Sequence, residues 1–243
     1  MKMNRPGVRA FALAGCAALA AGSLAAQDVT VYGTAALDGN HTNIELVGGS
    51  ARFGGAGLAP EVGLQAYHLG YEVGTGNRET WAVMPSVGAS YRMPVGQVGA
   101  RVGYSFQSND DAGVAVVEGA GGGSGVVVSG QGNYWGPGPE LQGIVSYSVE
   151  PKYLWSQAQA SVPVLPMPPG QLRLGAEVTA EGITESGGGS AISVGPLLKW
   201  SSGHNWSVSA SGGGRFYGGS STRDNTWYAK VGIVKYGIHL GMM

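Results

Sequence analysis

From residue 27 onward, apolar side chains recur at every second position and not at the 3.6-residue spacing of an amphipathic helix. Between residues 97 and 107 the apolar side chains occupy the even positions, and Arg101 occupies an odd one. Between residues 172 and 181 leucine, valine and alanine alternate with polar residues that include Arg173 and Glu177. Period-two alternation is typical of strands that bury one face and keep the other polar.

Alternating segments separated by turn residues predict a series of strands along the whole chain. We place twelve, with ten as the alternative if two weak hairpins are loops. The predicted strands run over residues 28–38, 42–53, 60–74, 78–92, 96–107, 125–136, 140–149, 153–164, 170–183, 189–201, 205–217 and 226–242.

The connections between these strands also alternate in character. Those after odd-numbered strands include the longest polar segments, such as 108–124 and 218–225. Those after even-numbered strands are short and rich in Gly and Pro, such as 136–139 and 165–170. Short periplasmic turns and longer outside loops are typical of outer-membrane barrels. The predicted fold is therefore an all-β, closed antiparallel transmembrane β-barrel with both termini on the periplasmic side.

The first 26 residues predict a secretory signal peptide ahead of a barrel that occupies 27–243. A basic head is followed by an apolar run that ends in small residues at Ala26, and this run is too short for a membrane anchor. Leu13-Ala14-Gly15-Cys16 resembles a lipoprotein lipobox, which leaves lipidation of Cys16 as an alternative to its removal. Removal would leave no cysteine and no thiol chemistry.

Composition narrows the class of protein further. Charged residues make up 12% of the chain, whereas there are 45 Gly, 11 Tyr and six Trp. After residue 26 there is no run of roughly 18 apolar residues, which a membrane helix needs. The net charge of −1 argues against a nucleic-acid partner. A soluble β-sandwich or periplasmic barrel would also alternate, but it needs large side chains on its inner face; here that face is rich in Gly, Ser, Gln and Thr.

Aromatic residues lie near the predicted strand ends, where the interfacial girdles of membrane barrels are found. They are Tyr32, Trp81, Tyr91, Tyr104, Tyr134, Trp135, Tyr153, Trp155, Trp200, Trp206, Phe216, Trp227 and Tyr228. The last strand is predicted to place Val234, Tyr236, Ile238, Leu240 and Met242 on one face, after an irregularity at 231–233 that suggests a bulge. The chain ends in Met243, where barrels of this kind usually carry an aromatic residue.

The charged residues of the polar face are predicted to line the barrel lumen. They are Glu45, Glu72, Arg92, Arg101, Arg173, Glu177, Glu181, Lys199 and Arg215, together with His68, Lys235 and His239. Because their signs are mixed, we interpret them as a structural lattice of ion pairs, with the lining of a narrow water-filled pore as the alternative.

We find no catalytic, cofactor-binding or metal-binding constellation in the sequence and expect the protein not to be an enzyme. His204 and Ser207 have no nearby acid to orient the histidine. Asp110, Asp111 and Asp224 fall in predicted outside loops that contain no His. The four histidines show no metal-ligand spacing.

Several short strand segments resemble the cellulose-biosynthesis outer-membrane barrels of the BcsS type. These segments are Tyr32–Leu37, Leu69–Val73, Gly99–Phe106, Leu172–Thr179 and Trp227–Ile233. The resemblance implies a role beside exopolysaccharide production or export and transfers no catalytic residue.

We therefore expect a non-enzymatic barrel of a Gram-negative outer membrane that supports exopolysaccharide biosynthesis or export. Its expected partners are outer-membrane lipid, the barrel-insertion machinery, and exopolysaccharide or its export apparatus, without nucleic acid or cofactor. Two alternatives remain: a narrow porin-like channel for small polar solutes and, with less support, a lipid-modifying enzyme or protease of the outer membrane.

Overall fold

The computed structural model describes residues 28–73, 76–108, 124–135, 138–150, 152–186, 188–202, 206–221 and 223–236. The predicted signal peptide, the glycine-rich part of the 108–124 loop, His204 and His239 lie outside these residues. The described residues contain no helix of the length and apolarity that a membrane crossing requires.

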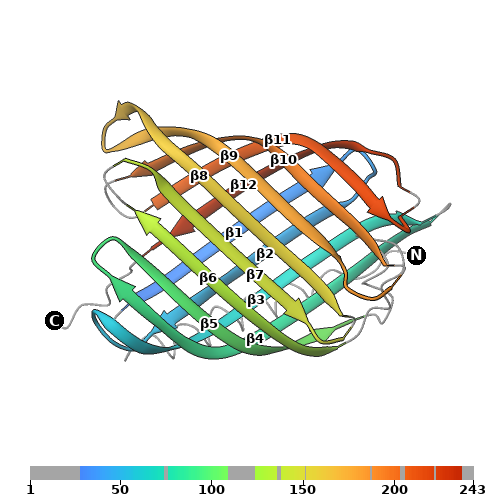
Figure 1. Ribbon diagram of the computed structural model, residues 1–243, viewed down its shortest axis with the longest axis horizontal. Helices are drawn as coiled ribbons and strands as arrows, with labels where there is room; N and C mark the ends of the chain where they lie inside the picture. Colours follow the sequence, from blue (N-terminus) through green and yellow to red (C-terminus); the bar gives the residue numbers. More distant parts are fainter. Residues whose placement is uncertain are drawn as a thin grey trace, which may run out of the picture.

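The described residues form twelve strands, close to the predicted bounds (Figure 1). These are β1 (Asp28–Asp38), β2 (Asn43–Arg52), β3 (Gly57–Val73), β4 (Gly76–Met93), β5 (Gly96–Gln107), β6 (Gly125–Trp135), β7 (Glu140–Ser148), β8 (Tyr153–Met167), β9 (Gly170–Ile183), β10 (Gly189–Ser202), β11 (Trp206–Gly219) and β12 (Thr226–Lys235).

Each strand pairs antiparallel with its neighbours in sequence, and β1 also pairs with β12, which closes the sheet into a barrel. Val31 of β1 lies opposite Lys235 of β12, so the two ends of the described chain lie at one end of the barrel. We call this the terminal end and the opposite one the loop end. The closed antiparallel barrel predicted from the sequence is confirmed.

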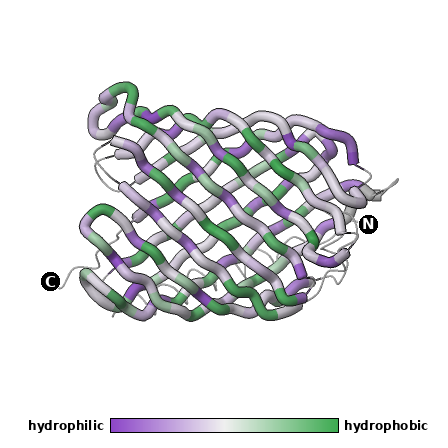
Figure 2. Tube along the Cα trace, viewed as in Figure 1, coloured by the Kyte–Doolittle hydropathy of each residue, from purple (hydrophilic) through white to green (hydrophobic). Residues whose placement is uncertain are grey.

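The outward face of the barrel is apolar and unprotected by protein. On β5 the outward side chains Val98 and Phe106 are 49% and 57% exposed, whereas the inward Ser105 is 4% exposed. Figure 2 shows hydrophobic and hydrophilic residues alternating along the strands in the same way. Soluble proteins rarely expose contiguous apolar surface on this scale. The exposed band is the surface that a transmembrane barrel presents to lipid.

Two local features show how the sequence shapes the strands and turns. The Asp38 carboxylate accepts hydrogen bonds from the backbone N–H groups of Asn40 and Thr42, at 2.9 and 3.0 Å, and so holds the β1–β2 turn. In β10 a Cβ on Gly195 would lie 2.1 Å from the carbonyl oxygen of Gly212. Glycine at this position therefore allows β10 and β11 to curve tightly around the interior.

The last strand differs from the prediction. Its pairing with β1 and β11 is continuous through residues 231–233, without a bulge. Val231 and Ile233 are exposed on the outward face, and Val234 and Tyr236 therefore face the interior, where they line the cavity. Lys235, predicted to line the lumen, instead lies outside, with its Nζ 5.2 Å from the centre of the Trp206 ring.

The aromatic girdles are also less complete than predicted. Trp81, Tyr91 and Phe216 fall on the outward positions of their strands, as a girdle requires. Five of the predicted girdle residues, from β1, β6, β8 and β12, occupy inward positions instead: Tyr32, Trp135, Tyr153, Trp155 and Tyr228.

Candidate functional site in the barrel interior

A cavity of about 620 Å³ runs through the interior. At the loop end it reaches Asp38 and Thr42, which are buried, and at the terminal end it reaches Ser201 and Ser202, which are half-buried. Eight-stranded barrels are filled by their own side chains, and barrels with 16 or more strands leave a wide channel. This barrel falls between these two classes.

Most of the predicted lumen residues do face the interior. Arg92, Arg101, Glu177, Glu181, Lys199 and Arg215 line the cavity, and the buried side chain of Arg173 donates hydrogen bonds to Ser161 and to the carbonyl oxygen of Gly138.

Glu45 and Glu72 lie instead on the outward face, together with His68. Glu45 is paired with His68 in the β2–β3 ladder, with 3.9 Å between Oε2 and Nδ1. The His68 ring stacks on Trp81 at 4.1 Å between centroids, and its Nε2 lies 3.9 Å from Glu79 Oε2. These residues lie near the loop end, where an outward charge leaves the hydrocarbon zone and meets polar headgroups and water.

At the loop end, the inward positions of β2 and β3 are apolar and aromatic. Leu69 and Tyr71 of β3 pack with Ala191 of β10, which lies five strands away around the barrel. Tyr67, Ile44, Tyr153 and Tyr217 complete this group. We call these seven residues the loop-end plug, because they fill part of the interior between opposite walls.

A polar network lies beside the loop-end plug. Arg215 pairs with Glu181 and with Asp38, the latter at 3.5 Å between Nε and Oδ2. Tyr153 donates a hydrogen bond to Glu181, and Tyr217 donates one to Asp38. These contacts join β1, β8, β9 and β11 beside the plug.

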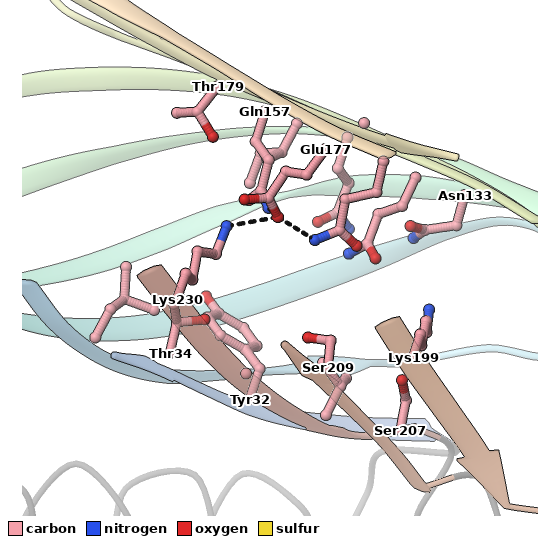
Figure 3. A pocket seen from close by; sticks show the side chains of 18 of the residues that line it. Tyr32, Thr34, Asn133, Gln157, Glu177, Thr179, Lys199, Ser207, Ser209 and Lys230 are labelled. Atoms are coloured by element: carbon pink, nitrogen blue, oxygen red, sulfur yellow. Dashed lines mark hydrogen bonds and ion pairs between the residues drawn. The ribbon is translucent and has the colours of Figure 1, made fainter. Parts of the chain in front are cut away.

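Glu177 is the centre of a second network, in the middle of the cavity (Figure 3). Its carboxylate accepts hydrogen bonds from Gln157 and Gln159 at 2.7 and 2.5 Å and from Ser211 at 3.1 Å. Lys230 Nζ lies 2.9 Å from Glu177 Oε2. A buried carboxylate requires this degree of pairing to stay ionised.

Three ion pairs each join strands that are three places apart in the barrel: Lys230 to Glu177, Arg92 to Asp28, and Lys199 to Glu140. Three of the twelve described strands are a quarter of the circumference, so each pair bridges the interior. Within the described residues, every inward acid has a basic partner. The lattice predicted from the mixed signs of the lumen residues is therefore present.

The wall between these bridges is uncharged. Five amide side chains from β6, β7 and β8 line the cavity, and we call them the amide wall: Gln131, Asn133, Gln142, Gln157 and Gln159. In the strand ladders Asn133 lies opposite Gln142, and Gln142 lies opposite Gln159. Asn133, Gln142 and Gln159 thus form an unbroken row of neutral hydrogen-bonding groups, and Ile144 lies between Gln131 and Gln157 in the neighbouring row.

Several lumen residues were missed by sequence reasoning. They are the inward Asp28, Asp38, Arg52, Glu61, Glu140 and Lys230, together with the amide wall. Lys230 could have been found from the alternation of its strand, because it has the opposite parity to Val231, which faces outward. Glu61 belongs to a strand in which odd positions face inward, so a correct phase for β3 also places it inside.

Of the candidate catalytic residues, the structure describes only Ser207 and Asp224. Ser207 is buried on the inward face of β11, whereas His204, Asp110 and Asp111 lie outside the described residues. Asp224 lies at the loop end, between β11 and β12. Among the described side chains, no three of His, Cys, Asp or Glu form a group that could hold a metal ion.

The sequence matches no known family model and none of the curated proteins. Among solved structures, it is similar to the β domain of the Bordetella autotransporter BrkA, with 13% identity over 85% of this chain and 97% of that chain and a TM-score of 0.48. It is similar to LpxR from Salmonella typhimurium, with 11% identity over 85% and 99% and a TM-score of 0.49. It is also similar to the translocator domain of NalP from Neisseria meningitidis, with 12% identity over 94% and 96% and a TM-score of 0.42. Similarity at this level carries no functional argument, and the fold rests on the strand order and register described above.

Proposed function

We propose that the protein is a non-enzymatic barrel of a Gram-negative outer membrane that supports the biosynthesis or export of an exopolysaccharide. In this proposal the terminal end faces the periplasm and the loop end faces outward, as the short turns and longer loops indicate. The segments similar to BcsS-type barrels favour a cellulose-like polymer as the exopolysaccharide.

The observation that carries the proposal is the neutral, hydrogen-bonding lining of the cavity between paired charges. Amides of β6, β7 and β8 face hydroxyl groups of β1 and β11. Polysaccharides carry many hydroxyl groups and little apolar surface, so such walls suit them better than they suit lipids or peptides. Catalysis is not part of the proposal, because the described acids Glu140, Glu177 and Glu181 of the cavity are engaged in ion pairs.

The proposal includes export through the signal peptide at residues 1–26. N-terminal sequencing of protein from the outer-membrane fraction tests this part. A mature chain that begins at Gln27 is expected, whereas a lipidated N-terminus at Cys16 would support the lipobox alternative.

Deletion of the gene tests the role in exopolysaccharide supply. We expect less matrix polysaccharide outside the cell, with recovery when the wild-type protein is supplied again. Unchanged secretion and composition of the matrix in the deletion strain would contradict the role.

The second candidate is a narrow diffusion channel for small polar solutes. It is favoured by a cavity that extends from Asp38 to Ser202, over much of the barrel. Planar-bilayer recordings of the purified protein test it. Discrete conductance steps are expected of a channel, whereas a silent bilayer would exclude it and leave the first proposal intact.

A further inference from the structure

We propose that the amide wall is a binding site for an uncharged, polyhydroxylated carbohydrate. This inference rests on the proposed function and goes further, because it names the ligand class and the side chains that would hold it. The ligand is a segment of a neutral polysaccharide or a free neutral oligosaccharide, which present the same hydroxyl groups.

The amide groups at the centre of the wall have a fixed orientation. Gln157 and Gln159 both point their Nε2 donors at the Glu177 carboxylate. A carboxylate only accepts hydrogen bonds, so the reverse amide orientation would place two oxygens together. Each glutamine therefore presents its Oε1 acceptor to the rest of the cavity.

The amide group of Gln131 has the opposite orientation to those of Gln157 and Gln159. Its Oε1 accepts a hydrogen bond of 2.7 Å from Arg101 Nη2. Because a guanidinium only donates, the Nε2 donor of Gln131 remains for the cavity. The wall thus combines oriented acceptors and an oriented donor, and a sugar hydroxyl can satisfy either kind. Asn133 and Gln142 line the cavity beside them without a hydrogen bond to any described residue.

The opposite wall carries hydroxyl groups. Figure 3 shows Thr34, Ser207 and Ser209 on the strands that face Gln157 and Asn133 across the cavity. Tyr32 of β1 lies on the same wall as Thr34 and donates a hydrogen bond to Gln65. Trp155, next to Gln157 on the inward face of β8, adds a flat apolar surface to the lining. Aromatic rings beside neutral hydrogen-bonding groups suit the mixed polar and apolar faces of a sugar ring.

The paired charges argue that the ligand is uncharged. Glu177 is matched by Lys230, Glu140 by Arg173 and Lys199, and Arg101 by Glu61. A charged sugar would lose hydration on entry and would have to compete for a partner that is already engaged. A neutral sugar exchanges hydrogen bonds with water for hydrogen bonds with amides, at little electrostatic cost.

Isothermal titration of the full-length mature barrel in detergent tests the inference. The probes are β-1,4-linked gluco-oligosaccharides of two and six residues, with hexameric oligogalacturonate and a hexameric glucosamine oligomer as acidic and basic counterparts. The test variant is Asn133→Leu combined with Gln142→Met, which removes two cavity amides and leaves the ion pairs intact. The control is Gln107→Met, an inward glutamine of β5 that does not line the cavity. Heat-modifiable gel migration equal to that of wild type shows that each variant is folded.

We expect the neutral hexamer to bind at least tenfold more tightly than either charged hexamer. The double variant should lose roughly tenfold in affinity, as expected for two lost hydrogen bonds, and the control should bind like wild type. Tighter binding of the hexamer than of the dimer indicates a polymer segment, and equal binding indicates a free oligosaccharide.

No binding of the neutral oligosaccharides, equal binding of a charged one, or an unchanged double variant would overturn the inference. These results would leave the proposed export role to the deletion experiment. Conversely, an unchanged matrix in the deletion strain would contradict the proposed role without altering a measured affinity.

Discussion

Lys230 of β12 extends across the interior to Glu177 of β9, with 2.9 Å between Nζ and Oε2. Glu177→Ala would leave this lysine and two glutamine amides without their acceptor. Breaking a buried ion pair from one side costs about 3–5 kcal/mol, and we expect the lower end because Lys230 faces the cavity. Urea unfolding followed by tryptophan fluorescence measures the loss of stability.

The matched control for this substitution removes both charges. Glu177→Gln with Lys230→Met leaves no unpaired ion, so we expect it to cost less than Glu177→Ala alone. If the double variant is at least as unstable as the single one, the pair does not hold the lattice together.

The loop-end plug should restrict passage through the barrel. Leu69→Ala combined with Tyr71→Ala removes two plug side chains between β3 and β10 and is expected to raise the single-channel conductance severalfold in planar bilayers. Leu58→Ala is the control, since this side chain on the same strand is 74% exposed. A conductance that is equal in the plug variant and the control would show that the plug does not limit the pathway.

The outward position of Glu45 can be checked by chemical labelling. In a Cys16→Ser background, Glu45→Cys should react with a bulky, membrane-impermeant maleimide, because its side chain is 65% exposed on the outer surface. Thr179→Cys, which lines the cavity, should react much more slowly. Equal protection of both cysteines would contradict the assigned strand phase.

The connection between β7 and β8 provides a test by pH. The hydrogen bond of 2.6 Å from Lys152 to Glu185 raises the pKa of the Lys152 amine above its ordinary value, helped by the carboxylate charge. A raised pKa in the folded state means that the contact is fully present below the ordinary lysine pKa and is lost as the pH rises through the raised value.

NMR titration of reductively methylated protein follows this lysine directly. We expect the Lys152 signal to titrate at higher pH than that of a free lysine and to move back toward the ordinary pKa in Glu185→Gln. A titration that is the same in both proteins would exclude the contact in solution.

The fold could be predicted from the sequence because apolar and polar residues alternate over many positions in each strand. Three predicted strands, at 28–38, 96–107 and 170–183, match the observed bounds of β1, β5 and β9. Which face of a strand points inward was harder to predict where both faces carry mixed polar and apolar residues. In β3 the polar His68 and Glu72 suggested an inward even face, but the apolar odd face is inward because Leu69 and Tyr71 pack in the plug.

The residues of the candidate site could be predicted only in part from the sequence, for a different reason. Charged residues such as Glu177 and Arg215 are conspicuous in a chain with few charges, and alternation places them inside. The partners of each charge depend on which strands face one another across the barrel, and this requires the closed geometry. Glutamine and asparagine are uncharged and occur on many polar strand faces, so the sequence alone does not single out the amide wall. The register of β6, β7 and β8 is what places these side chains next to one another.

The central claim is a closed barrel that resides in a membrane, and its electrophoretic behaviour tests it most directly. Extracted in detergent and loaded without boiling, the protein should migrate as a compact species, and after boiling it should migrate near its full mass. Purification as a stable, soluble protein without detergent, with migration unaffected by boiling, would contradict the account.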